Sequence, residues 1–188
     1  MKILRAFIAI EIDEAVRQKL VAAQRQLADT GAQLRLVEPE NIHVTMKFLG
    51  DIRENQIGAI TDAVQTAVAG VGPFDISVRG IGVFPDLRYI RVIWAGVSDG
   101  REQVTSIQKR ADQNLAELGF KPERDFVPHL TLARAKSAAG KERLVEFLKS
   151  MTNAEFGSCR VGAVELKQST LTPKGPIYST LAHIELSP

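Results

Sequence analysis

The sequence predicts an α+β fold, a bilobal duplicated unit in which two mostly antiparallel sheets face a central groove and helices cover the outer faces. Three observations predict it. Strand patterns of period two occur beside amphipathic helix patterns, strands often follow one another without a helix, and the same order of elements recurs after about 86 residues. We therefore expect residues 1–188 to form one domain of two pseudo-symmetric lobes, rather than a doubly wound parallel sheet.

The first half begins with an alternating strand and a helix whose boundaries are marked by polar and glycine residues. Asp13 is a suitable N-cap, and Gly31 can end the helix. Two glycines, Gly80 and Gly82, indicate a bulge or bend in a later strand. The expected elements are a strand at 4–12, a helix between Asp13 and Gly31, a strand or loop at 34–37, a strand at 42–49 that turns at residues 50–51, a helix at roughly 54–69 and a strand at 74–84.

The second half repeats this plan, with Asp99 in the place of Asp13 as the expected cap and Gly119 as the helix stop. A final hairpin closes the chain, because a turn rich in proline and glycine separates two strand patterns. The expected elements are a strand at 89–97, a helix at 99–118, a strand at 129–133, a helix at about 140–151, and strands at 159–171 and 178–186 joined by the turn 172–176.

Composition restricts the class of protein. No run approaches the ~18 apolar residues of a membrane span, and the N-terminus lacks a signal-peptide pattern. Cys159 is the single cysteine, which favours a reducing compartment, so we expect a cytoplasmic monomer with no membrane partner. A net charge of +2 is low for a protein that coats long nucleic acid, but it suits one that handles a strand end.

Two of the three histidines lie in matching His-x-Thr strand motifs. In the first, His43, Thr45 and Lys47 are expected on one face, opposite Ile42, Val44, Met46 and Phe48. In the second, His129 and Thr131 share a face opposite Leu130 and Leu132. His183 lacks the following threonine, and we interpret it as structural.

This pair of motifs suits in-line displacement at phosphorus. One imidazole can accept a proton from attacking water while the other gives a proton to the departing oxygen, because the imidazole pKa lies near ~6.5. The hydroxyls of Thr45 and Thr131 can donate hydrogen bonds to non-bridging phosphate oxygens. No metal or other cofactor is needed for this chemistry.

At this point the chain resembles the two-histidine (2H) phosphoesterases, and within them the LigT-like RNA 2′,3′-cyclic phosphodiesterases, historically called 2′-5′ RNA ligases. The resemblance extends over almost the whole chain, and its most specific part is the second motif with the closing hairpin. The matching stretches are RAFIAIEI, NIHVTMKFLGD, GIGVFPDLRYIRVIWAGV, FVPHLTLARAK and STLTPKGPIYSTLAHIEL.

The resemblance implies hydrolysis of a terminal 2′,3′-cyclic phosphate to a 2′-phosphomonoester on RNA ends, such as tRNA-like or other fragments, with possible reverse 2′-5′ ligation. It implies that His43 is the proton donor and His129 the proton acceptor, an order that the residues alone leave open. It also implies a phosphate- or substrate-binding role for Arg134, although strict alternation places Arg134 beside Leu130 and Leu132. We further expect Phe7 to stack on a nucleobase.

Three alternatives remain at this point. The substrate could be a small cyclic nucleotide, a 2′-5′ oligoadenylate or ADP-ribose 1″,2″-cyclic phosphate. The chain could bind RNA ends without catalysis, although binding alone needs no second proton-transfer group. A zinc hydrolase is the third, but the histidines lack the close spacing that usually forms a zinc site.

Overall fold

The computed structural model describes residues 2–188, which form an α+β fold. The expected fold class is confirmed. The strands are β1 (Ile3–Ile10), β2 (Leu34–Leu36), β3 (Val44–Arg53), β4 (Phe74–Asp86), β5 (Tyr89–Val97), β6 (His129–Ala135), β7 (Glu155–Val161), β8 (Ala163–Thr172) and β9 (Gly175–Glu185), and the α-helices are α1 (Glu14–Asp29), α2 (Ile57–Val68), α3 (Arg101–Glu117) and α4 (Lys141–Ser150).

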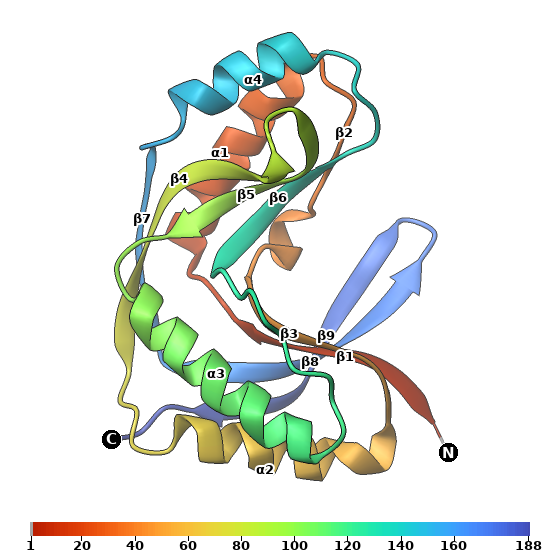
Figure 1. Ribbon diagram of the computed structural model, residues 1–188, viewed down its shortest axis with the longest axis vertical. Coiled ribbons are helices and arrows are strands. Elements are labelled where there is room, and N and C mark those ends of the chain that lie inside the picture. The colour runs from red at the N-terminus through yellow and green to blue at the C-terminus, as the bar shows by residue number, and fades with distance from the viewer. Residues whose placement is uncertain (1) are drawn as a thin grey trace.

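The strands form one curled sheet in the order β7-β4-β5-β6-β3-β1-β8-β9, with β2 paired to β6. Every pairing within residues 2–188 is antiparallel. The two expected sheets are thus two halves of a single sheet, which meet where Val44 of β3 pairs with Leu130 of β6. Figure 1 shows the two halves curving around a common centre, with β6 and the β8–β9 hairpin on either side.

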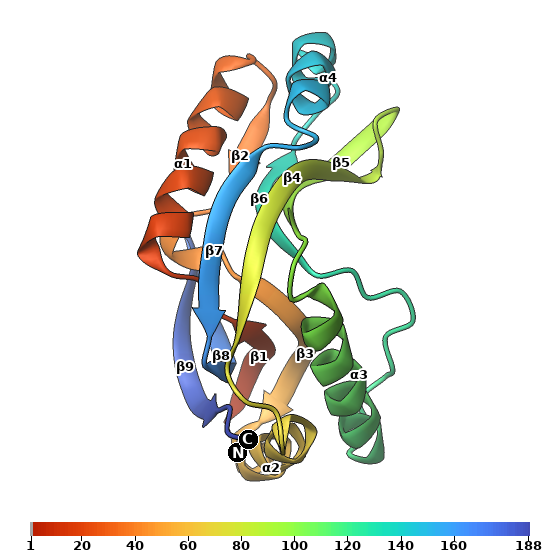
Figure 2. The same cartoon turned by 90° about the vertical axis from the view of Figure 1, so that its left-hand side faces the viewer.

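Helices from one half of the sequence pack on strands from the other half. α1, from the first part of the chain, packs on β7 and β6, whereas α3, from the second part, packs on β3 and α2. Figures 1 and 2 show α1 and α4 over one half of the sheet and α2 and α3 over the other. The spatial halves are therefore not the sequence halves. The longest helix, α3, has 17 residues, and none in the described part of the chain is long and apolar enough to cross a membrane.

Most expected elements are confirmed, and Asp13 caps α1 by accepting a hydrogen bond from the Val16 amide at 2.9 Å. Three expectations were wrong. The strand expected at 159–171 is two strands, β7 and β8, and between them the chain crosses from one half of the sheet to the other at Gly162. β3 runs through the expected turn at residues 50–51 as far as Arg53. The N-cap of α3 is Gly100, at φ +74°, and not Asp99.

Both motif strands contain a bulge at the same place, three residues after the histidine. In β3, Thr45 pairs with Ala9 and Lys47 with Ile8, so Met46 is the extra residue. In β6, Thr131 pairs with Trp94 and Ala133 with Ile93, so Leu132 is extra. A bulge resets the alternation of side chains, and it therefore re-aims every residue that follows the threonine.

Candidate active site

The four motif side chains gather around the single pair that joins the two halves of the sheet. Val44 and Leu130 are fully buried and point into the core. Extending this antiparallel register by one residue each way sets His43 opposite Thr131 and Thr45 opposite His129, all on the other face. The two histidines occupy a diagonal, and diagonal neighbours lie roughly 7–8 Å apart. The two imidazoles therefore extend from the same face of the sheet as near neighbours.

A cavity of about 330 Å³ opens beside this group. Four of the expected site residues line it, namely His43, Thr45, Thr131 and Arg134. His129 is not among its lining residues and joins the group through the strand register. The other walls of the cavity come from residues 35–38 and Asn41, from Phe48, and from the β8–β9 hairpin through Leu171, residues 174–176 and Tyr178.

The bulges correct three expected side-chain directions. After Leu132, Ala133 is buried and Arg134 is exposed on the cavity side, so strict alternation misplaced Arg134 with Leu130. After Met46, Lys47 turns to the helix side, where it is buried and pairs with Asp112 of α3. Phe48, expected to face the helices, lines the cavity with 69% of its surface exposed.

Phe7 cannot offer a free ring face to a nucleobase, because it is only 2% exposed. It stacks on the His43 ring at a centroid distance of 5.1 Å and contacts Tyr178 edge-on at 4.7 Å. Phe7 thus holds the His43 ring by packing against it. The exposed aromatic ring at this wall is Phe48, 6.1 Å from Phe7.

The environment of His43 strongly favours its neutral form. Burial lowers its pKa from 6.5 to about 4, and the cations of Lys167 and Arg17 add to the shift. The Asn41 carbonyl opposes the shift but lies outside hydrogen-bonding geometry, so the Nδ1 atom of His43 has no partner within residues 2–188. The Nε2 atom of His43 and the Oγ1 atom of Thr45 are 2.9 Å apart and share a hydrogen bond.

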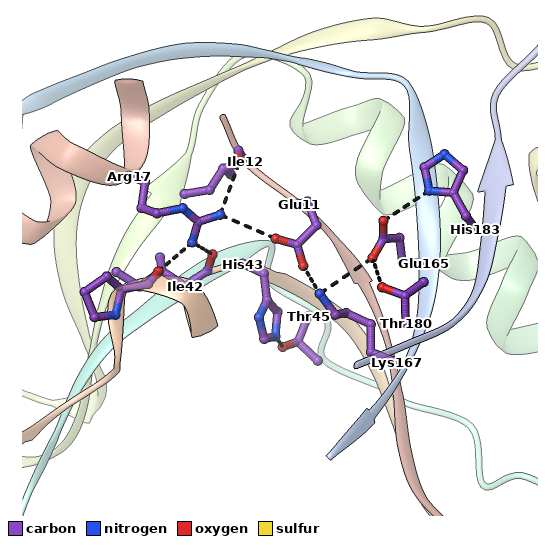
Figure 3. A network of polar contacts seen from close by, with 11 residues as sticks. Glu11, Ile12, Arg17, Ile42, His43, Thr45, Glu165, Lys167, Thr180 and His183 are labelled. Carbon is purple, nitrogen blue, oxygen red and sulfur yellow. Dashed lines mark hydrogen bonds and ion pairs between the residues drawn. The ribbon is translucent and has the colours of Figure 1, made fainter. Parts of the chain in front are cut away.

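A partly buried ionic network lies beside this histidine (Figure 3). Glu11 lies between Arg17 and Lys167 and pairs with both cations. Arg17 also donates hydrogen bonds to the carbonyls of Pro39 and Ile42, which fixes the segment that leads into His43. The network is therefore placed to hold the position of the imidazole without contacting a substrate.

His183 belongs to the outer edge of the same network. Its Nδ1 atom lies 3.1 Å from Glu165 Oε1, and Glu165 in turn pairs with Lys167. The His183 side chain is exposed and does not line the cavity, which agrees with its interpretation as structural.

His129 is held differently, through its backbone neighbour and an aromatic wall. Its Nδ1 atom donates a hydrogen bond to the Val127 carbonyl at 2.7 Å, because a carbonyl can only accept. This fixes the tautomer and leaves Nε2 with the lone pair in the neutral ring. Burial lowers the pKa of His129, although the Val127 carbonyl opposes this. Phe84 packs edge-on against the ring at 5.0 Å, with Trp94 at 6.1 Å.

Sequence reasoning missed Arg35, Lys174 and Tyr178 as cavity residues. Arg35 reaches the site because β2 pairs with β6, in which Arg35 lies opposite Arg134. The hairpin residues belong to a stretch that carries the family resemblance, but their position over the motifs depends on the curvature of the sheet.

Comparison with known proteins agrees with this geometry. A family model described as LigT like Phosphoesterase matches residues 10–94 and 96–178. A Methanothermobacter thermautotrophicus protein named RNA 2′,3′-cyclic phosphodiesterase is 45% identical over 178 residues, covering 95% of this chain and 96% of that protein. The crystal structure of TT0787 from Thermus thermophilus has a TM-score of 0.81 at 28% identity, covering 97% of this chain and 98% of that one. That of E. coli LigT complexed with 3′-AMP has a TM-score of 0.77 at 22% identity and covers all of both chains. The chain, with its two His-x-Thr strands around one junction, therefore belongs to the LigT-like phosphoesterases.

Proposed function

We propose that the protein is an RNA 2′,3′-cyclic phosphodiesterase that opens a terminal cyclic phosphate to a 2′-phosphomonoester by two-histidine acid–base catalysis. One observation carries the proposal: the Val44–Leu130 register sets both His-x-Thr motifs around one point beside a single cavity. The name of the Methanothermobacter relative and the 3′-AMP bound to E. coli LigT support the choice of a ribonucleotide substrate.

In the proposed reaction His129 is the proton acceptor. The hydrogen bond from its Nδ1 atom to Val127 leaves Nε2 free to take a proton from water. As the water oxygen attacks phosphorus, the bond from phosphorus to O3′ breaks. The departing O3′ takes a proton from His43, and the phosphate remains on O2′.

His43 must be protonated to act as the donor, yet its pKa of about 4 makes it neutral at pH 7. A bound cyclic phosphate carries a negative charge, and an anion at this distance raises the pKa of an imidazole. Substrate binding would therefore favour protonation of His43, which supplies the proton used in catalysis. Thr45 and Thr131 would donate hydrogen bonds to the phosphate oxygens, and Arg134 would add positive charge.

In this proposal Phe48, and not Phe7, contacts the nucleobase. Phe48 exposes most of its ring on the cavity wall, and stacking on an aromatic ring tolerates any base. Because the same transition state serves both directions, reverse 2′-5′ ligation of RNA ends would use the same residues.

The identity of the product tests the proposal. The protein is incubated with 2′,3′-cyclic AMP, and separately with a short RNA that ends in a cyclic phosphate, in the presence of EDTA. The expected product is the 2′-phosphomonoester, identified by chromatography against both isomers. Release of the 3′-isomer, loss of activity with EDTA that zinc restores, or RNA binding without any turnover would each contradict the proposal.

A further inference from the structure

Three cations line the cavity. Arg35, Arg134 and Lys174 form no ion pair within residues 2–188. By contrast, the nearby cations Arg17, Lys47 and Lys167 are all paired with carboxylates. The cavity therefore carries an excess of positive charge that the fold itself does not neutralise, with Glu38 as the acidic residue among its lining residues.

Two of these cations lie at the end of the cavity away from the histidines. Arg35 is opposite Arg134, three residues along β6 from Thr131, which corresponds to roughly 10 Å at the rise of a strand. The Arg35 guanidinium extends toward the hairpin turn, where it lies 3.8 Å from the position that a Cβ atom would take on Gly175. Lys174 is the adjacent residue of that turn. Arg35 thus lies beside Arg134 on the strand next to the second motif and faces the hairpin turn.

Building on the proposed function, we propose that Arg35 and Lys174 form a subsite for the phosphodiester that precedes the terminal nucleotide of a single-stranded RNA. Two unpaired cations that face the same space repel each other, and an anion between them removes this cost. A guanidinium and an ammonium group are also the usual protein ligands of phosphate oxygens.

The occupant follows from the position and the charge of this subsite. It belongs to the cavity that contains His43, so its anion can be covalently joined to the group that reacts. Exposed apolar side chains, Leu36 and Leu171, line the same cavity and can contact sugar and base. The structure therefore favours an RNA strand over a mononucleotide.

The test compares kcat/KM for three substrates: 2′,3′-cyclic AMP, the same nucleotide with a free 5′-phosphate, and the dinucleotide ApA that ends in a 2′,3′-cyclic phosphate. The wild-type protein is expected to prefer the dinucleotide. In the double variant Arg35→Ala, Lys174→Ala the ratio of dinucleotide to mononucleotide kcat/KM should fall about tenfold, as expected for the loss of two exposed charge contacts. The control Arg25→Ala removes an exposed arginine of α1 outside the cavity and should keep the wild-type ratio.

The possible outcomes separate the two proposals. If none of the three substrates is turned over, the proposed function is wrong. If cyclic AMP is hydrolysed but the dinucleotide has no advantage, or the double variant keeps its advantage, the subsite alone is wrong. If the free 5′-phosphate gives the full advantage of the dinucleotide, the cations bind a terminal phosphate, and the assignment to a strand-internal diester is overturned.

Discussion

The two motif strands are alike in sequence and in shape but differ in what surrounds each imidazole. Both place a histidine and a threonine on the cavity side, and both bulge three residues after the histidine, at Met46 and at Leu132. His43 is 8% exposed and lies beside partly buried ion pairs, with no partner for Nδ1 in the described part of the chain. His129 is only half-buried, and the Val127 carbonyl holds its Nδ1–H.

This difference teaches how one repeated motif can supply two chemical roles. An imidazole whose tautomer is fixed by a carbonyl is ready to accept a proton at Nε2. An imidazole whose pKa is lowered to about 4 in a cationic setting responds strongly to an incoming anion. The bulges extend the contrast, because five residues after each histidine the cavity receives Phe48 from one strand and Arg134 from the other. One side thus offers an apolar ring and the other a charge.

Removal of either imidazole should have the largest effect. His43→Ala and His129→Ala should each lower kcat by about 10²- to 10⁴-fold, because in the proposed mechanism each group transfers a proton in the transition state. The double variant should lose little more than the worse single variant, since the two groups act as a unit. Steady-state kinetics on 2′,3′-cyclic AMP measures this, with His183→Ala as the matched control because His183 lies outside the cavity. Near-normal turnover in either single variant would refute the assigned roles.

The buried state of His43 should also make the fold sensitive to acid. Its pKa is about 4 in the folded protein and 6.5 as the reference value, so the neutral form is favoured by folding. Above pH 6.5 His43 is neutral in both states, so its protonation does not affect the free energy of unfolding. As the pH falls toward 4, His43 gains a proton in the unfolded state that it lacks in the folded state. The free energy of unfolding should therefore fall by up to about 3 kcal/mol over this range.

The variant His43→Gln isolates this contribution. Urea unfolding at about pH 7 and at about pH 4.5 should show a smaller loss of stability in the variant than in the wild type. His129→Gln should reduce this loss of stability between about pH 7 and about pH 4.5 by a smaller amount, because His129 is more exposed than His43. Equal acid sensitivity in the wild type and in His43→Gln would mean that the folded protein accommodates a protonated His43 even without substrate.

Side-chain alternation was enough to predict which face the motif side chains share but not the residues around them. Period-two patterns placed His43, Thr45, His129 and Thr131 on polar faces, because the bulges come only after each threonine. No local sequence pattern indicates the extra residue Leu132. Its carbonyl accepts hydrogen bonds from Gln24 and Val37, which both lie far from it in the chain. Arg35 was missed for a similar reason, since its pairing with Arg134 is a long-range contact that local patterns do not contain.

Phe48 provides the smallest expected effect and the sharpest test of the bulge in β3. Base stacking is worth about 1–3 kcal/mol, so Phe48→Ala should raise KM for 2′,3′-cyclic AMP by roughly tenfold while kcat changes little. Tyr89→Ala is the matched control, because Tyr89 is equally exposed, at 65% against 69% for Phe48, but lies outside the cavity. Phe7→Leu should instead lower kcat, since Phe7 supports the His43 ring and has almost no exposed surface. The reverse result, a raised KM in Phe7→Leu and an unchanged KM in Phe48→Ala, would return the base contact to Phe7 and would mean that substrate binding rearranges this wall of the cavity.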